Sequence, residues 1–159
     1  MGTHYQGTEE ERQALDVFIK LMRAASSVAE RSGQSFMVAG LSPSHFGVLE
    51  TLYHLGPLKV SQLADKHLKS HNNFTVVIDN MEKSGLVTRE RVPEDRRVVM
   101  VHLTDKGREC IEAVFPCFVQ RLTEEMKVLS AQEQQQLSCL LRRLGKGRCP
   151  TKGTPDNDI

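Results

Sequence analysis

The chain of 159 residues has a length that fits one domain, or one compact subunit of an oligomer. Its content of 39% hydrophobic and 26% charged residues is ordinary for a globular protein and excludes an intrinsically disordered chain. A net charge of +1 excludes attraction of nucleic acid or membranes by the overall charge, so any basic surface must be local.

Sequence signals for membrane insertion or export are missing. No apolar run approaches the roughly 20 residues of a membrane-spanning helix. The start of the chain, "MGTHYQGTEEERQ", lacks the apolar core of a signal peptide. We therefore expect a cytoplasmic protein with no membrane partner.

The four cysteines form no C-x-x-C pair, which argues against zinc-ribbon and thioredoxin chemistry. We expect neither a metal nor a cofactor. Cys110 and Cys117 stand seven residues apart and share one face of a predicted helix. That placement suits packing between helices as well as a redox-active thiol, so both interpretations stay open.

The first predicted element is an amphipathic helix from Glu9 to about Arg31, where apolar residues recur at steps of three and four. The next stretch, "RSGQSFMVAG", is typical of a connection. A second helix is predicted from the N-cap Ser42 and the first-turn residue Pro43 to Gly56. Its buried face would consist of Phe46, Leu49, Leu52 and Tyr53.

A short extended segment and a short helix from about Ser61 come next, and then a helix over residues 72–84. Ser70 to Asn73 would cap this helix and Gly85 would end it. One face is apolar: Phe74, Val77, Ile78 and Met81. The other carries side-chain types that hydrogen-bond to base edges and phosphates: Asn72, Asn73, Thr75, Asn80 and Lys83. Val76 lies close to this face, where it either packs at the edge of the core or touches a thymine methyl group.

Two β-like runs, "LVTRERV" and "VVMVHL", flank Pro93 and predict a hairpin. In the second run, Val99, Val101 and Leu103 share one face. The tip carries the charged residues Glu94 to Arg97, and such a tip by itself would suit a solubilising turn.

The last part of the chain predicts two helices and a tail. Thr104 would cap a helix that runs to about Leu129, with a kink before Pro116. Ser130 and Glu133 form a capping box for the last helix, which Gly145 would end.

Short helices followed by a hairpin are typical of a winged helix-turn-helix. The expected fold class is therefore mainly α with a small β-hairpin wing, completed by helical arms. The helix over residues 72–84 would enter the major groove, and Arg96 and Arg97 would reach the neighbouring minor groove. Asp95 is placed to orient Arg97 through a charge-assisted hydrogen bond.

These motifs resemble those of a known family. "LVTRERVPEDRRVVMVHLTDKG" resembles the wing signature of the MarR family of bacterial transcriptional regulators, with its D-x-R at Asp95–Arg97 and its Leu-Thr at Leu103–Thr104. "FGVLETLYHLGPLKVSQLADKHL" and "VVIDNMEKSGLV" resemble the preceding helices, and residues 115–146 resemble a branch that includes quinone- and phenol-responsive repressors. The resemblance covers about residues 10–146. Two features depart from it: His71-Asn72 replaces frequent small residues, and Val76 replaces a common Arg or polar residue.

No Ser/His/Asp, Cys/His or paired-carboxylate arrangement has a recognisable context in the sequence, so we do not expect an enzyme. The resemblance implies a homodimeric regulator that binds double-stranded DNA at a pseudo-palindromic operator. Its helical dimerisation region would be residues 1–40 and 105–146, its DNA-binding lobe residues 41–104, and its flexible basic tail residues 147–159. The apolar surface of the first helix and the last two helices agrees with dimerisation. The expected DNA-binding residues are Ser70, His71, Asn72, Asn73, Thr75, Val76, Asn80, Lys83, Asp95, Arg96 and Arg97.

Family members usually repress transcription and leave DNA when a small molecule binds between the helical and DNA-binding parts. The resemblance thus implies a small aromatic, phenolic or quinone-type effector. The candidates for lining such a cleft, which also suit plain core packing, are Met22, Met37, His45, Phe46, Leu49 and Tyr53. Two alternatives remain: a thiol-based sensor that uses Cys110 or Cys117 on the same scaffold, and a winged helix that binds a protein.

Overall fold

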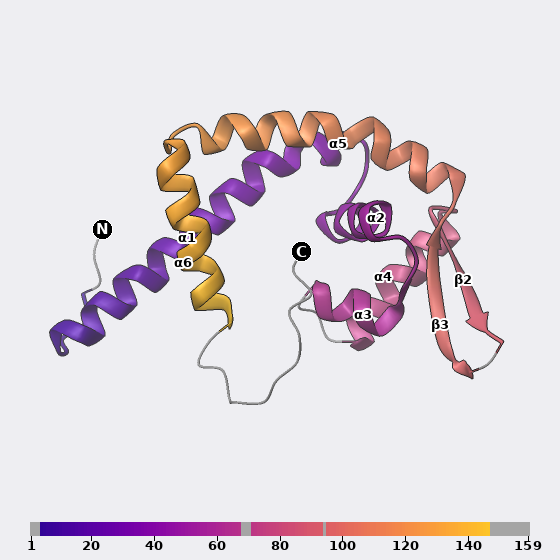
Figure 1. Cartoon of the computed structure of the whole chain (residues 1–159), viewed down its shortest axis with the longest axis horizontal. Coiled ribbons are helices and arrows are strands. Elements are labelled where there is room, and N and C mark those ends of the chain that lie inside the picture. Colours follow the sequence, from indigo (N-terminus) through magenta and orange to yellow (C-terminus); the bar gives the residue numbers. More distant parts are fainter. Residues whose placement is uncertain (1–3, 68–70, 94, 147–159) are drawn as a thin grey trace. The chain divides into compact units, whose positions relative to one another are not determined.

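The computed structural model describes residues 4–67, 71–93 and 95–146, and for residues 71–73, 96 and 97 it describes the backbone alone (Figure 1). The elements are α1 (Glu9–Met37), α2 (Pro43–Leu55), β1 (Leu58–Lys59), α3 (Val60–Lys66), α4 (His71–Lys83), β2 (Val87–Val92), β3 (Asp95–Leu103), α5 (Asp105–Met126) and α6 (Ala131–Lys146). The predicted fold class, mainly α with a small β wing, is confirmed. The chain divides into two compact units, Met1–Thr123 and Glu124–Ile159. Within the described ranges, no helix has both the length and the apolar content to cross a membrane.

α1 begins as predicted but ends later. Its N-cap Thr8 accepts a hydrogen bond from the Glu11 backbone N–H at 3.2 Å, and the Glu11 carboxylate accepts one from the Thr8 N–H at 2.8 Å. The helix continues to Met37, so the predicted end near Arg31 is wrong. The reason is tertiary packing, because Phe36 in the last turn is buried and stacks on Phe46 with ring centroids 4.3 Å apart.

α2 lies at the centre of the first unit. It begins at the predicted cap, where the Ser42 hydroxyl accepts a hydrogen bond from the His45 N–H at 3.1 Å. Val48 and Leu49 on this helix are fully buried. The largest fully buried side chains among the described residues come from α2, α3, α4, α5 and the sheet: Val48, Leu49, Leu63, Phe74, Ile78, Met81, Val87, Val101 and Ile111.

The sheet is antiparallel, with strand order β1-β3-β2. β1 adds a third strand to the predicted hairpin by pairing Leu58 with Val101. β2 and β3 pair regularly from Val87 and Leu103 to Arg91 and Val99, after which Val92 pairs with Asp95. This register shift leaves residues 96–98 of β3 without a partner in the pairing near the wing tip.

The start of α5 is joined tightly to the base of the wing. The Thr104 hydroxyl accepts a hydrogen bond from the Gly107 N–H at 3.0 Å and donates one to the Gly85 carbonyl oxygen at 2.7 Å. A Cβ atom at Gly107 would lie 2.0 Å from the Leu86 carbonyl oxygen, so only glycine allows this approach. α5 runs through Pro116 without interruption and ends at Met126, not at Leu129.

α6 has the predicted start. The Glu133 carboxylate accepts hydrogen bonds from the Ser130 hydroxyl at 2.7 Å and from the Ser130 N–H at 2.8 Å. These bonds, the side-chain one first, lower the pKa of Glu133. The predicted end at Gly145 is wrong, because the helix is described through Lys146. None of the residues of α6 is buried.

Candidate nucleic-acid interface

α4 presents two contrasting faces. Phe74, Ile78 and Met81 are fully buried and Val77 is half-buried, so the predicted apolar stripe is present. The residues of the opposite face are exposed: Thr75, Val76, Asn80 and Lys83. Val76 is 57% exposed and therefore lies on the surface, not at the edge of the core.

The remaining candidates on this helix lie at its first turn. The backbones of His71, Asn72 and Asn73 begin α4. Their side chains are outside the described residues, and so is Ser70. Their predicted DNA contacts therefore stay predictions.

His67, at the end of α3, ties the start of α4 to α2. Its ring stacks on Phe74 at a centroid distance of 5.5 Å, and its Nε2 lies 3.2 Å from the Thr51 hydroxyl oxygen. A Cβ atom at Gly47 would lie 2.7 Å from the His67 ring, so α2 has a glycine where the ring approaches. His67 was not among the functional residues predicted from the sequence. The available signal was Gly47 itself, because a glycine inside a helix usually has a packing reason.

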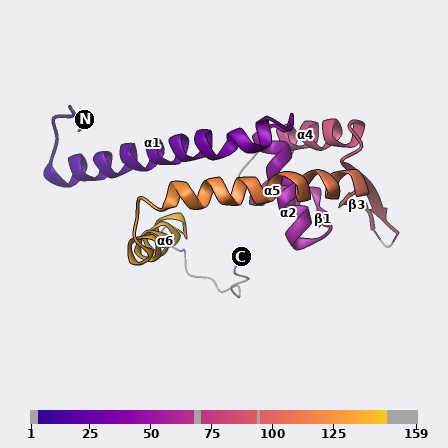
Figure 2. The ribbon, with the colours of Figure 1, turned by 90° about the horizontal axis from the view of Figure 1, so that it is seen from above.

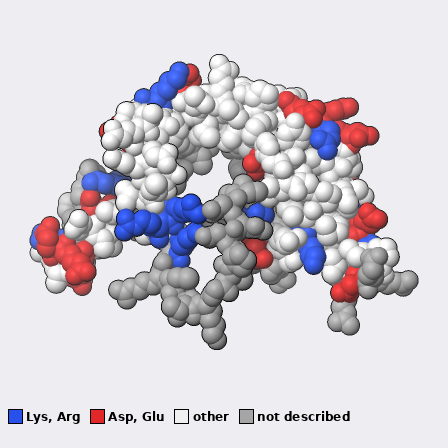
Figure 3. Space-filling model, viewed as in Figure 1, with Lys and Arg blue, Asp and Glu red and all other residues white. Residues whose placement is uncertain are grey.

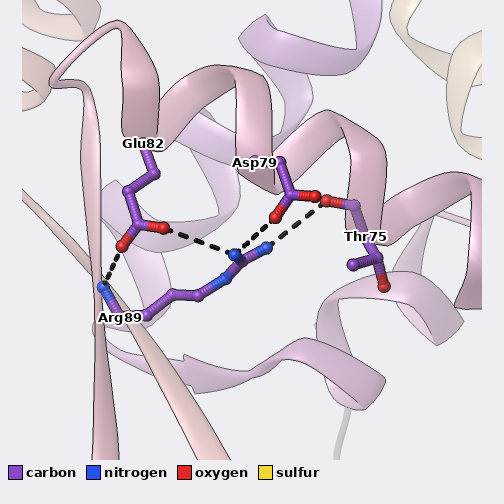
Figure 4. Close-up of polar contacts among 4 residues, drawn as sticks. All are labelled: Thr75, Asp79, Glu82 and Arg89. Carbon is purple, nitrogen blue, oxygen red and sulfur yellow. Dashed lines mark hydrogen bonds and ion pairs between the residues drawn. The ribbon is translucent and has the colours of Figure 1, made fainter.

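Arg89 of β2 fixes the wing to α4 (Figure 4). Its guanidinium donates to the Asp79 carboxylate at 2.5 Å, to the Glu82 carboxylate at 3.3 Å and to the Thr75 carbonyl oxygen at 3.3 Å. Its backbone N–H donates to Glu82 as well, at 3.1 Å. We call these four residues the Arg89 clamp. The clamp sets where the wing stands relative to the exposed face of α4.

The clamp was not predicted from the sequence, where "LVTRERV" was interpreted only as one β-like run of a hairpin. One signal was present: Asp79 and Glu82 are three residues apart and share one face of a helix. The sequence did not show that β2 packs against that face of the helix.

The wing tip is described only in part. Asp95 is exposed and begins β3, opposite Val92. The side chains of Arg96 and Arg97, like all of Glu94, lie outside the described residues. The predicted orientation of Arg97 by Asp95 therefore stays a prediction.

Charge on the surface of the first unit is mixed. In the view of Figure 3, Lys and Arg side chains are scattered among acidic and uncharged ones. This agrees with a net charge of +1. Exposed cations on the elements of the sheet and α4 include Lys59, Lys83 and Arg91.

The structure brings only some of the effector candidates together. Phe46 and Leu49 are buried in the core, where Phe46 also packs on Phe118 at a centroid distance of 4.7 Å. His45 and Tyr53 are half-buried on the same helix. Met22 and Met37 are 54% and 49% exposed on α1. They stand fifteen residues apart, about 22 Å along the helix axis, so one chain does not gather both around one small molecule.

α1 and α5 enclose part of that region. Their adjoining parts run side by side in the two ribbon views (Figures 1 and 2), and Arg121 of α5 donates a hydrogen bond to Gln34 of α1 at 3.3 Å. Phe36 and Phe118 also meet there, with centroids 6.0 Å apart. The result is an aromatic contact between α1, α2 and α5.

The thiols differ in exposure. Cys110 is half-buried and packs against the core, whereas Cys117 and Cys139 are exposed. Cys149 lies outside the described residues. In the part of the chain that the structure describes, no three His, Cys, Asp or Glu residues gather as they would around a metal ion.

Comparisons with known proteins agree with this architecture. The model of the MarR family matches residues 41–99. The chain is 39% identical over 137 residues to the uncharacterised HTH-type transcriptional regulator YkoM of Bacillus subtilis (strain 168), a match that covers 86% of this chain and 89% of that protein. It is 35% identical over 133 residues to the HTH-type transcriptional regulator MhqR of the same strain, with 84% and 92% covered.

Solved structures give the same result. Reduced AbfR bound to DNA is 27% identical, with a TM-score of 0.65 and with 84% of this chain and 99% of that chain covered. NadR in complex with 4-hydroxyphenylacetate shares the fold, with a TM-score of 0.73, 22% identity and 93% and 100% covered. This chain therefore belongs to the MarR family and is a DNA-binding transcriptional regulator.

Proposed function

We propose that this regulator is a homodimer that represses transcription from a pseudo-palindromic operator and leaves it when a small phenolic or quinone-type compound binds. Residues 1–40 and 105–146 would form the dimerisation region and residues 41–104 the DNA-binding lobe. The proposed basic tail, residues 147–159, lies outside the described residues. The observation that carries the proposal is the exposed polar face of α4 beside a wing held by the Arg89 clamp.

Exposed apolar side chains on α1 and α6 support dimerisation. Val17, Phe18 and Met22 on α1 are each more than half exposed. On α6, Leu137, Leu140, Leu141 and Leu144 form one stripe and are each at least 40% exposed. Apolar faces of this kind mark interaction sites, and a two-fold dimer explains a two-fold operator.

The double variant Leu140→Asp/Leu144→Asp tests the dimer. Analytical ultracentrifugation should give a dimer for the wild type and a monomer for the variant. Glu133→Asp, a change elsewhere on α6, serves as the control and should remain dimeric. A dimeric double variant would contradict this use of α6.

DNA binding is tested by fluorescence anisotropy with DNA from upstream of the protein's own gene, across a salt series. We expect tight, sequence-selective binding that weakens steeply with salt. Changing both Arg96 and Arg97 to Ala should weaken it strongly, since arginines in a narrow minor groove contribute to affinity. Undiminished affinity in this double variant would favour the alternative in which the wing binds a protein.

The effector is proposed from chemistry and from one structural relative. NadR was solved with 4-hydroxyphenylacetate, a phenol, and the candidate region here is rich in aromatic rings, including Phe46 and Tyr53. Adding a panel of phenols and quinones to the DNA complex tests the proposal. One compound class should release the DNA, and release by none of them would overturn this part.

The second candidate function, that of a thiol sensor, is supported by the exposure of Cys117. This residue is exposed on α5, whereas Cys110 is half-buried, so Cys117 is the more accessible to an electrophile. Mass spectrometry after quinone treatment tests this mechanism. If quinone releases DNA and neither cysteine carries an adduct, the thiol mechanism is wrong and reversible binding accounts for release.

A further inference from the structure

His67 lies where three helices of the winged lobe meet. It is the C-cap residue of α3, and its backbone N–H donates a hydrogen bond to the Leu63 carbonyl oxygen at 3.1 Å. Its ring contacts two other helices, at Gly47 and Thr51 of α2 and at Phe74 of α4. One side chain therefore links all three helices.

α2 accommodates this ring closely. Gly47 and Thr51 stand four residues apart and share one face of the helix. A Cβ atom at Gly47 would lie 2.7 Å from the ring. The Thr51 hydroxyl is buried, and the Nε2 of His67, at 3.2 Å, is nearer to it than the Glu50 carboxylate at 3.4 Å. On its opposite face α2 is anchored in the core by Leu49, so the ring rests on a helix that is itself fixed.

On α4, the ring of His67 meets the side chain that comes just before the exposed face. Phe74 is fully buried, and its ring stacks on that of His67 with centroids 5.5 Å apart and planes inclined by 19°. Thr75 and Val76, the next two residues, are exposed. The N-terminal residues of a recognition helix are the ones that contact base edges. The stacking therefore constrains α4 at the end that would read DNA.

The Arg89 clamp is a separate attachment of the same helix. Its carboxylates, those of Asp79 and Glu82, come later in α4 and connect the helix to β2. The clamp reaches the start of α4 only through the Thr75 carbonyl oxygen, at 3.3 Å. His67 connects that start to α2 and α3 instead, so the two attachments hold α4 from different sides of the lobe.

The rotation of α4 about its own axis matters more for reading bases than for holding phosphates. The ends of helix side chains lie about 6 Å from the axis, so a rotation of about 10° moves them by about 1 Å. Hydrogen bonds to base edges form over a range of only about 0.5 Å. Long cationic side chains adjust to such a shift and keep their phosphate contacts.

We propose that His67 is a positioning residue for sequence recognition, which fixes the rotation of α4 without itself contacting DNA. The inference rests on the proposed use of the exposed face of α4 in reading bases. Loss of the ring should lower the affinity for the operator and leave the affinity for random DNA nearly unchanged, because non-specific binding depends on phosphate contacts. The ratio of these two affinities is the quantity that His67 controls.

The test compares His67→Ala with the wild type by fluorescence anisotropy at one salt concentration. The operator is the sequence that the wild type selects from a random DNA library. In His67→Ala the ratio of operator affinity to random-DNA affinity should fall about tenfold, the effect of losing roughly one base contact. His67→Phe keeps an aromatic ring beside Phe74 and should restore most of the ratio.

Two further variants separate positioning from a general loss of stability. Gly47→Ala leaves His67 in place but displaces its ring, so the ratio should fall here as well. Ile111→Val removes one methylene from a fully buried side chain of α5 and should lower Tm without changing the ratio. All affinities are measured at a temperature at which circular dichroism shows each variant to be folded.

The outcomes are distinct. If the wild type selects a sequence and both His67→Ala and Gly47→Ala keep its affinity ratio, His67 has no positioning role and the proposed function stands. The same holds if Ile111→Val lowers the ratio as much as they do, because the effect then follows stability alone. If the wild type selects no sequence, the proposed function and the role of His67 fail together.

Discussion

The winged lobe and α6 differ in how far their apolar residues are buried. In the lobe, α2, α4 and the sheet enclose fully buried side chains such as Leu49, Phe74 and Val101. α6 carries a regular leucine stripe, yet none of its residues is buried. The lobe is thus stabilised by its own core, whereas the stripe of α6 gains stability only when another surface covers it.

The largest expected effect comes from replacing a phenylalanine of the closed core with alanine, to be compared with the same replacement at an exposed phenylalanine. Phe74→Ala should destabilise the lobe by about 3–5 kcal/mol, because it leaves a cavity in a closed core. Urea denaturation measures this, and the loss should not depend on protein concentration.

Phe18→Ala is the matched control, since Phe18 is 57% exposed on α1. Its effect should appear mainly as weaker association and should fade at high protein concentration. Equal, concentration-independent losses in the two variants would contradict the contrast between apolar side chains in a closed core and those left exposed on a helix.

A smaller effect is expected at Gly47, where the lobe is packed against the His67 ring. Gly47→Ala gains about 1 kcal/mol of helix propensity but forces the ring away from Thr51. We expect a net destabilisation of about 1 kcal/mol in the wild type. In a His67→Ala background the same change should be stabilising, because the obstacle is gone. A Gly47→Ala effect that is identical in both backgrounds would show that the ring does not restrict this position.

The Arg89 clamp should affect DNA affinity more than stability. The Asp79 and Glu82 side chains are 43% and 40% exposed, so water screens these ion pairs and their contribution to folding is small. Arg89→Ala should lower operator affinity about tenfold, or about 1.4 kcal/mol, with little change in Tm. Arg12→Ala, which breaks an exposed pair with Glu9 on α1, is the control and should leave both quantities unchanged. A large fall in Tm for Arg89→Ala would instead assign the clamp to folding.

The smallest effect is expected at the start of α6. The pKa of Glu133 is lowered by its hydrogen bonds from Ser130, so the charged carboxylate favours the folded helix. That contribution is complete above the ordinary carboxyl pKa and is lost as pH falls through the lowered one. Thermal unfolding followed by circular dichroism should therefore find Ser130→Ala less stable than the wild type at neutral pH, and this difference should shrink as pH falls through the lowered pKa. Identical curves for the two proteins would mean that the cap does not control Glu133.

Features that depend only on residues close together in the sequence could be predicted from it. The caps at Ser42 and Ser130 and the apolar stripe of α4 follow from short spacings, and the structure has all of them. The predicted end of α1 was wrong because Phe36 stacks on Phe46, a contact that exists only after folding.

The same division applies to the candidate site. The residue types on the exposed face of α4 follow from its helical period. Arg89 was missed because its partners, Asp79 and Glu82, lie on another element that only the fold brings close. To predict such a residue, one must know which strand packs on which helix, and the pattern of a single sequence does not give this information.

The joint at Gly107 has a mechanical consequence. Gly107 packs closely against Leu86, and the Thr104 hydroxyl donates a hydrogen bond to Gly85, so α5 and the base of the wing are held tightly together. From Leu103 to Asp95, β3 extends about 27 Å beyond that joint. A rotation of α5 by about 10°, carried rigidly through the joint, would move the wing tip by about 5 Å. α5 and the wing thus form a lever, in which a small turn of a helix becomes a displacement larger than the length of a hydrogen bond.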